Sequence, residues 1–383
     1  MAIDNKDKKI LNVPPLRFPE FTEEWKAEQL DNIATLSKGI GISKEQLSED
    51  GEPCILYGEL YTKYKSEIIK QVESKTDING SKLKRSKAND VIIPCSGETA
   101  VDIATARCVP FDNILFGGDL NVISLHQYDG AFMSYQLNGK RKYDIARVAQ
   151  GVSIVHLYGE HLKAIKTYNP TLPEQQKIAK LLSLLDDRID TQNKIIEKLQ
   201  SLIKGLRVCC MQRVYGNNVY LSEIAQIYQP QTISSTELTE DGFLVYGANG
   251  IIGKYKDYNH ETEQICITCR GNTCGMVNYT KPMSWITGNA MVINTDKYQD
   301  KVCKRNLYHY LSAYNFNSII SGSGQPQIVR TPLEKLKITL PTISEQKQKA
   351  IIFDKIQDKI DINHKVLNLY IGQKQYLLRQ MFI

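Results

Sequence analysis

Long apolar runs are missing from this sequence. No stretch approaches the roughly 18 apolar residues that a membrane-spanning helix needs. The opening segment, Met-Ala-Ile-Asp-Asn-Lys-Asp-Lys-Lys, is charged and lacks the apolar segment of a signal peptide. Nine cysteines in 383 residues, without a secretion signal, are typical of reduced thiols. We therefore expect a cytoplasmic protein with no membrane partner.

Signatures of catalysis are also absent. The sequence contains no Gly-x-x-x-x-Gly-Lys-Ser/Thr loop, and its six histidines form no His-Glu-x-x-His motif. The Asn-Pro-Pro-Tyr type of motif of amino-methyltransferases is missing too. The glycine-rich stretch 321–327 lacks the third glycine of a dinucleotide-binding turn, so we interpret it as a flexible loop. We expect no catalytic residue and no cofactor in this chain.

Cysteines at a metal-binding spacing are few. Cys266, Cys269 and Cys274 superficially resemble half of a zinc site. The residues between the first two are β-formers, however, and positions three apart on a strand face opposite sides. We therefore expect buried thiols and no metal site.

A strong excess of one charge is also lacking, since 48 Lys and Arg stand against 42 Asp and Glu. Residues 1–170 carry 22 basic and 23 acidic side chains, and residues 216–343 carry 11 and 10. Residues 171–215 and 344–383 each have a basic excess of three. Any binding of nucleic acid must therefore depend on local basic clusters.

The sequence does contain an internal repeat, whose two copies are 171 positions apart. Residues 174–212 align with 345–383 without a gap, and eight of the 39 pairs are identical. Apolar residues in both segments alternate at spacings of four and three, the pattern of a coiled-coil seam, although the second seam is weaker at its ends. The seam residues are Ile178, Leu182, Leu185, Ile189, Gln192, Ile196, Leu199, Ile203 and Leu206 in the first copy, and Lys349, Phe353, Ile356, Ile360, Asn363, Leu367, Tyr370, Lys374 and Leu377 in the second.

Both predicted helices begin in the same way. Residues 171–174 (Thr-Leu-Pro-Glu) and 342–345 (Thr-Ile-Ser-Glu) each follow a proline and have the spacing of a capping box. We predict two helices of about 40 residues, each about 60 Å long. Two unrelated amphipathic helices are the alternative, but both seams carry a polar residue near the midpoint, Gln192 and Asn363. We therefore predict an antiparallel pair in which Gln192 lies near Asn363 and fixes the register.

The segments before the two helices match more loosely. Residues 92–99 (Ile-Ile-Pro-Cys-Ser-Gly-Glu-Thr) align with 266–273 (Cys-Ile-Thr-Cys-Arg-Gly-Asn-Thr). Short β-rich runs bounded by Gly, Pro, Asn and Asp favour globules of mixed α/β structure. The predicted fold class is α/β in the α+β sense, a tandem repeat of globule and long coiled-coil helix related by a pseudo-two-fold axis. Its predicted segments are 1–170, 171–215, 216–341 and 342–383.

Basic and amide side chains gather in several local clusters. Arg, Lys, Asn and Gln are the residues that contact base edges and phosphates. A solvated surface charge is the simpler interpretation for any one of them, but the clusters together favour contact with DNA. The candidates are Lys82, Lys84, Arg85, Lys87, Lys140, Arg141, Lys142, Arg147, Arg270, Asn272, Lys304, Arg305, Gln327 and Arg330.

Several short motifs occur in a fixed order along the chain. They are Leu-Arg-Phe-Pro-Glu-Phe at 16–21 followed by Trp25, Tyr-Gly at 57–58 and 246–247, Pro-x-x-x-Glu-Gln at 170–175 and 341–346, and Leu-Arg-Gln-Met-Phe at 378–382. In these motifs the sequence resembles the specificity subunits of type I restriction–modification systems. The resemblance covers essentially the whole chain, and its one departure is Val-Cys-Cys-Met at 208–211.

This resemblance implies a non-catalytic, DNA-reading subunit. Each of its two target-recognition domains would read one half of a bipartite site in double-stranded DNA, and the helices would space them. Two methyltransferase subunits would dock on the helices and use S-adenosylmethionine, and restriction subunits would use ATP and Mg²⁺. Two alternatives stay open: a fused single-chain restriction–modification enzyme, and a coiled-coil scaffold with globules that bind sugars or proteins.

Overall fold

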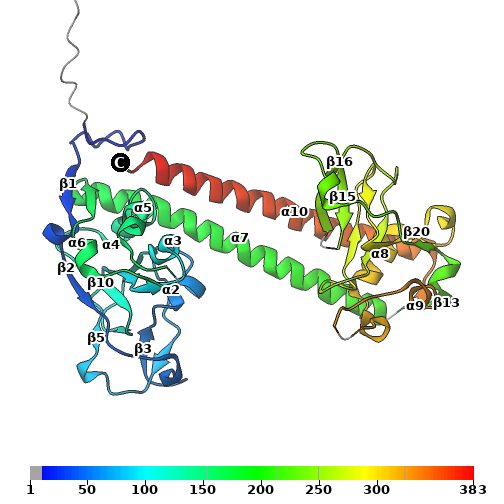
Figure 1. Ribbon diagram of the computed structural model, residues 1–383, viewed down its shortest axis with the longest axis horizontal. Coiled ribbons are helices and arrows are strands. Elements are labelled where there is room, and N and C mark those ends of the chain that lie inside the picture. Colours follow the sequence, from blue (N-terminus) through cyan, green and yellow to red (C-terminus); the bar gives the residue numbers. More distant parts are fainter. Residues whose placement is uncertain (1–10, 153, 213, 249, 323) are drawn as a thin grey trace, which may run out of the picture. The chain divides into compact units, whose positions relative to one another are not determined.

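The computed structural model describes residues 11–383 apart from 153, 213, 249 and 323 (Figure 1). It forms two compact units, each containing one globule and part of each long helix. The first unit is the chain up to Gln192 together with Val366–Ile383, and the second is Asn193–Lys365. This division cuts both long helices, so the four predicted segments stay a prediction.

The first globule contains a central antiparallel sheet with smaller sheets and short helices around it. The central sheet has the order β2 (Ala34–Lys38), β10 (Leu120–Leu125), β6 (Asp90–Pro94), β8 (Arg107–Val109). A second sheet has the order β4 (Lys75–Thr76), β3 (Glu52–Ile55), β9 (Leu115–Phe116), β5 (Lys84–Arg85), with β3 and β9 parallel. Two antiparallel pairs are β1 (Lys26–Gln29) with β12 (Lys166–Asn169) and β7 (Ser96–Gly97) with β11 (Val155–His156). The helices are α1 (Leu30–Ile33), α2 (Glu59–Thr62), α3 (Ala100–Ile103), α4 (Gly130–Asn138), α5 (Lys142–Val148) and α6 (Gly159–Lys163).

The second globule repeats this topology. Its central sheet has the order β14 (Gln226–Tyr228), β20 (Ala290–Asn294), β17 (Ile265–Thr268), β18 (Val277–Tyr279). A second sheet has the order β16 (Gly250–Tyr255), β15 (Phe243–Gly247), β19 (Trp285–Ile286), with β15 and β19 parallel, and β13 (Asn217–Tyr220) pairs with β21 (Lys337–Leu340). The helices are α8 (Lys304–Ala313) and α9 (Arg330–Glu334). The predicted tandem repeat and mixed α/β class are confirmed.

The central strand of each globule separates two cores. In β6, Val91 and Ile93 pack in one core and Ile92 packs in another, because alternate side chains on a strand face opposite sides. In β17, Cys266 belongs to one core and Ile267 to the other. Cys269 packs on the same side as Ile267, so Cys266 and Cys269 face opposite sides, as predicted. Burial raises the pKa of the Cys266 thiol to about 12.

The long helices are α7 (Leu172–Gln212) and α10 (Ile343–Gln380), drawn in green and in orange to red in Figure 1. In the first unit, Ile178 shares a core with Phe382, and Asp186 forms an ion pair with Lys374 at 2.7 Å. Residue numbers rise along α7 as they fall along α10, so the helices are antiparallel. None of the helices in the described residues is long and apolar enough to cross a membrane.

The glutamine of each Pro-x-x-x-Glu-Gln motif joins its long helix to the globule. Gln175 Nε2 donates to the Pro170 carbonyl at 2.8 Å, and its Oε1 accepts from the Asp129 N–H at 2.9 Å. In the second copy, Gln346 makes the same two bonds, to the Pro341 carbonyl and from the backbone N–H of residue 303, at 2.9 and 2.8 Å. The duplicated motif therefore has a structural role at the start of each helix.

Replacing Gln175 with leucine is expected to lower the free energy of unfolding by about 2–4 kcal/mol, because the buried Pro170 carbonyl and the partly buried Asp129 N–H lose their partners. Urea-induced unfolding of the purified chain measures the change. The neighbouring Gln176 is exposed, and Gln176→Leu should alter stability by less than about 0.5 kcal/mol. Equal effects of the two substitutions would contradict the proposed role of Gln175.

Only one of the two predicted capping boxes is present. At α10, Glu345 accepts from the Thr342 N–H at 3.0 Å, and the Glu345 N–H donates to the Thr342 hydroxyl at 3.3 Å. The prediction for α7 is wrong, because Glu174 is fully buried and accepts two bonds of 2.7 Å from Arg17 instead. The guanidinium, which comes from the Leu-Arg-Phe-Pro segment, neutralises the buried carboxylate.

A largely buried lysine, with 15% of its side chain exposed, joins the two helices to the first globule. Lys374 Nζ on α10 lies 2.6 Å from Glu67 Oε2 and 2.7 Å from Asp186 Oδ1 on α7. The Tyr135 hydroxyl on α4 donates to Asp186 Oδ2 at 2.7 Å. Burial opposes the charge of Lys374, but the two carboxylates outweigh it and raise its pKa. We call these four residues the lysine junction.

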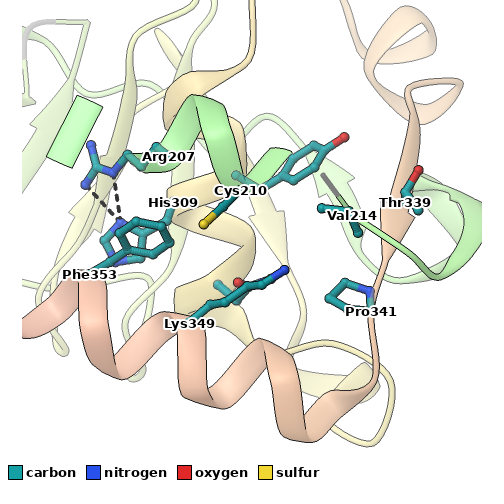
Figure 2. A pocket seen from close by; sticks show the side chains of 10 residues that line it. Arg207, Cys210, Val214, His309, Thr339, Pro341, Lys349 and Phe353 are labelled. Carbon is teal, nitrogen blue, oxygen red and sulfur yellow. Dashed lines mark hydrogen bonds between the residues drawn. The ribbon is translucent and has the colours of Figure 1, made fainter. Parts of the chain in front are cut away.

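The second unit has a corresponding junction built on a histidine. Figure 2 shows Arg207 of α7 directed at His309 of α8, and Arg207 Nε donates to His309 Nδ1 at 3.1 Å. Since arginine only donates, Nδ1 must accept and Nε2 carries the proton, which it donates to Asp354 Oδ1 of α10 at 3.0 Å. Phe353 packs beside the imidazole ring, with the centroids 4.9 Å apart. We call Arg207, His309 and Asp354 the histidine junction.

The predicted register contact between Gln192 and Asn363 stays a prediction. Gln192 belongs to the first unit and Asn363 to the second. The Gln192 side chain is buried, whereas Asn363 Nδ2 donates to the Lys359 carbonyl of its own helix at 2.6 Å.

Candidate nucleic-acid interface

Two loops are joined by backbone hydrogen bonds beyond the end of β6 in the first globule. We call residues 95–99 the strand-end loop and residues 150–157, of which residue 153 is not described, the return loop. The N–H of Cys95 donates to the Asp119 carbonyl at 2.7 Å, and its carbonyl accepts from the Leu157 N–H at 2.9 Å. The central sheet thereby fixes the position of both loops.

The second globule carries the same arrangement beyond the end of β17. Its strand-end loop is 269–273, and its return loop is 321–328, of which residue 323 is not described. The N–H of Cys269 donates to the Asn289 carbonyl at 3.0 Å, and its carbonyl accepts from the Ile328 N–H at 3.0 Å. In each globule, the strand-end loop and the return loop together form one element. We call this element, which occurs in both globules, the paired-loop frame.

Within each frame, a residue of the strand-end loop lies opposite a residue of the return loop, and the paired positions are equivalent in the two frames. His156 pairs with Ser96 in the first frame, and Gln327 pairs with Arg270 in the second. His156 exchanges two backbone bonds with residue 150, at 2.7 and 2.9 Å, and Gln327 exchanges two with residue 321, at 2.8 and 2.9 Å. The side chains of His156, Arg270 and Gln327 are exposed.

Each return loop turns on a glycine at an equivalent position. Gly151 has φ +119° and Gly322 has φ +89°, a region that residues with a side chain rarely adopt. A Cβ at Gly151 would meet the Ile154 carbonyl oxygen, and a Cβ at Gly322 would meet the Gln325 carbonyl oxygen. The glycine-rich stretch noted in the sequence is therefore a defined turn in its described residues.

The first frame borders an open hollow of about 710 Å³. Two half-exposed tyrosines, Tyr57 and Tyr61, line it, and the Tyr61 hydroxyl donates to the Ser96 carbonyl at 3.0 Å. Glu98 and Asp102 add carboxylates to the lining. In the second frame, the position equivalent to Glu98 is occupied by Asn272, also exposed. The frames therefore share a backbone and differ in the chemistry of their exposed side chains.

The type I restriction modification DNA specificity domain matches the chain twice, over residues 22–201 and 217–369. The chain belongs to this family. The two matches follow the tandem repeat of the fold. A match to a DNA specificity domain confirms the predicted type I specificity subunit and a role in recognition, not catalysis.

Two relatives and one solved structure illustrate the range of similarity. The specificity subunit of the type I restriction enzyme EcoprrI of Escherichia coli is 31% identical over 147 residues, which is 37% of this chain and 36% of that subunit. The type I restriction enzyme MjaVIII specificity subunit of Methanocaldococcus jannaschii is 24% identical over 94% of this chain and 92% of that subunit. The S subunit of a type-I restriction-modification system from M. genitalium has a TM-score of 0.69 at 18% identity, covering 97% of this chain and 99% of that one, and so shares the fold.

The first predicted basic cluster lies on or beside β5, at the edge of the second sheet of the first globule. Arg85 makes two bonds to Glu52, at 2.6 and 3.0 Å. Lys82, Lys84 and Lys87 have no carboxylate partner among the described residues. The three lysines therefore remain candidates for contact with phosphate, and Arg85 is held within the fold.

The second predicted cluster lies at the start of and along α5. Arg141 donates to the Ile383 carbonyl at 2.9 Å and forms an ion pair with Asp144 at 3.1 Å. Arg147 is exposed and pairs with the same carboxylate at 2.9 Å. Lys140 and Lys142 have no carboxylate partner among the described residues. Part of this cluster therefore holds the end of the chain, and its predicted contacts with DNA stay predictions.

Three predicted basic residues of the second globule are also paired. Lys304 Nζ lies 2.5 Å from Asp296 and donates to the Glu263 carbonyl at 2.6 Å. Arg305 lies 3.5 Å from Asp354 and stacks on a tyrosine ring. Arg330 binds the carboxylate of residue 334 at 2.6 Å.

The structure places Arg270, Asn272 and Gln327 together in the second frame. Residue types alone did not show that these three candidates are neighbours. Reasoning from residue types missed Glu98 and His156, because neither belongs to a basic cluster. The repeat alignment, which pairs residues 95–99 with 269–273, could have indicated Glu98 as the counterpart of Asn272, but it does not extend to His156. No group of three or more His, Cys, Asp or Glu residues suited to a metal ion occurs in the described part of the chain.

Proposed function

We propose that this chain is the DNA-reading subunit of a type I restriction–modification complex, and that each paired-loop frame reads one half of a bipartite site. The observation that carries the proposal is that one backbone frame occurs in both globules with different exposed side chains. A repeated scaffold with variable side chains suits recognition of two unlike half-sites. Exposed Lys82 and Lys87 and half-buried Lys84 would add contacts with phosphate, which position a protein on DNA without reading bases.

In this proposal, α7 and α10 space the two readers. α7 has 41 residues and so extends about 60 Å at 1.5 Å per residue, a length that DNA covers in about 18 base pairs. Joining two weak readers also raises the overall affinity, because the second binding event becomes intramolecular. We place the chain in the cytoplasm, where it would meet the DNA.

The long helices would also bind the catalytic subunits. Each unit presents two exposed apolar residues seven positions apart on a helix: Leu369 and Tyr376 of α10 in the first, and Ile195 and Leu202 of α7 in the second. On each helix the two residues share a face, and the two faces occur at nearly equivalent positions of the repeat. Such duplication favours two methyltransferase subunits, which would supply S-adenosylmethionine chemistry. Restriction subunits would supply the steps that need ATP and Mg²⁺.

Sequencing adenine methylation in a host with and without this gene tests the proposal. We expect a split methylated motif that disappears with the gene. An unchanged pattern, in cells that express the methyltransferase subunit, would contradict a DNA-reading role.

Exchanging residues 20–160 for those of a relative is expected to change one half of the methylated motif and leave the other half intact. The donor must retain the equivalents of Glu67, Tyr135 and Arg141, because these residues hold α10 in the first unit. Loss or change of both halves would count against independent readers.

Replacing Leu369 with glutamate is expected to weaken binding of the methyltransferase subunit at least about tenfold, because a charge would enter an apolar contact. Co-purification at defined salt measures the effect. Gln375→Glu adds the same charge on another side of α10 and serves as the control. Equal retention of the partner by the two variants would exclude docking at Leu369.

A further inference from the structure

The second frame places two base-reading side chains side by side. Arg270 and Gln327 lie opposite each other on an antiparallel bridge. Residues in that relation point to the same face, with their Cβ atoms about 5 Å apart. The Gly271 N–H donates to the Pro326 carbonyl at 3.0 Å, which fixes the backbones of both loops next to the pair.

Both side chains are available to a ligand. Arg85, Arg141, Arg147, Arg305 and Arg330 each bind a carboxylate of the chain, whereas Arg270 has no carboxylate partner among the described residues. The Gln327 amide likewise makes no side-chain hydrogen bond within the described part of the structure. Both residues are exposed, and their loop backbones are held by the hydrogen bonds of the frame.

The chemistry of the pair matches purine edges in the major groove. Arginine makes two hydrogen bonds to guanine O6 and N7, and glutamine makes two to adenine N7 and N6. Neighbouring base pairs are about 3.4 Å apart, a step that two side chains rooted about 5 Å apart can span. We propose that Arg270 and Gln327 read a guanine and an adjacent adenine in the half-site bound by the second globule. This inference rests on the proposed function.

The first frame lacks this pair and so provides an internal control. Ser96 and His156 occupy the positions of Arg270 and Gln327, with Ser96 Oγ 3.3 Å from His156 Nδ1. A change at Arg270 or Gln327 should therefore leave the first half of the motif unaltered.

The test co-expresses each variant with the methyltransferase subunit and determines the methylated motif by sequencing. Arg270→Ala should reduce discrimination at one guanine of one half-site by about 5- to 150-fold, and Gln327→Ala should do so at the adjacent adenine. Arg270→Lys keeps the charge but cannot make two hydrogen bonds in the same geometry. It should therefore also reduce the discrimination in favour of guanine. Lys297→Ala removes an exposed cation from the same globule, outside the candidate residues, and should not change the motif.

Several outcomes would overturn the inference. An unaltered motif with uniformly weaker methylation would assign Arg270 to a phosphate contact. If Arg270→Ala and Gln327→Ala reduced base discrimination at positions that are not adjacent, or in different halves of the motif, the proposed pair would be excluded. These results differ from failure of the proposed function, which would appear as the absence of a split motif with the unmodified chain.

Discussion

Replacing Lys374 with methionine is expected to destabilise the first unit by about 3–5 kcal/mol, since it leaves two buried carboxylates without their cation. Methionine keeps much of the apolar stem, so the loss comes mainly from the unpaired charges of Glu67 and Asp186. Urea-induced unfolding measures the change. The exposed neighbour Gln373 provides the control, and Gln373→Met should change stability by less than about 0.5 kcal/mol.

The same variant should respond to pH in a defined direction. Burial raises the pKa of Glu67, and the charge of Lys374 is the main one that opposes that rise, with a smaller contribution from Arg107. Without Lys374 the folded state should bind protons more tightly than the unfolded state, so its stability should increase as pH falls from 7 towards the ordinary carboxyl pKa. Adding Glu67→Gln and Asp186→Asn should restore much of the lost stability at pH 7. If Lys374→Met destabilised the first unit by less than about 1 kcal/mol, water would be solvating the two carboxylates in place of Lys374.

Acidification of the unmodified chain is expected to weaken the histidine junction. Burial lowers the pKa of His309 to about 4, from an ordinary value of about 6.5. The unfolded chain therefore binds the proton more readily, and the stability that this group contributes is present above about pH 6.5 and is lost as pH falls to about 4. At about 1.4 kcal/mol per pH unit, the loss over this range is about 3.5 kcal/mol at most.

Glutamine at position 309 separates this titration from that of other groups. Its amide can accept from Arg207 and donate to Asp354 as the neutral imidazole does, but it carries no charge at any pH. The stability of His309→Gln should therefore fall less than that of the unmodified chain between pH 6.5 and 4. Parallel pH profiles of the two proteins would assign the acid sensitivity to other residues.

Much of the architecture could be predicted from the sequence, because the same periodicity occurs twice. The seam residues Ile178, Leu182 and Ile203 are buried, as their spacing predicted. The capping box of α7 was mispredicted for a physical reason. A Thr-x-x-Glu spacing describes a local contact, and Arg17, 157 positions away, binds the carboxylate more strongly than the local backbone does.

The candidate site was harder to predict, because a basic residue type does not reveal whether the charge is already neutralised. Arg85 and Arg141 looked like Arg270 in the sequence, yet the first two are bound within the fold. The sequence placed Lys374 on the coiled-coil seam, but the partners of Lys374 and of His309 were not predicted, because they are distant in the chain. Only the folded structure separates internal charges from those available to a ligand.

The residues that directly follow α10 have a consequence for synthesis on the ribosome. Met381 and Phe382 are buried in the core of the first unit, beside Trp25 and Phe132. These two residues are translated after every residue of the second unit. Part of the apolar surface of the first globule therefore stays exposed during synthesis, until residue 382 has been added to the chain. Nascent chains stalled before that point should be sensitive to protease in their first half.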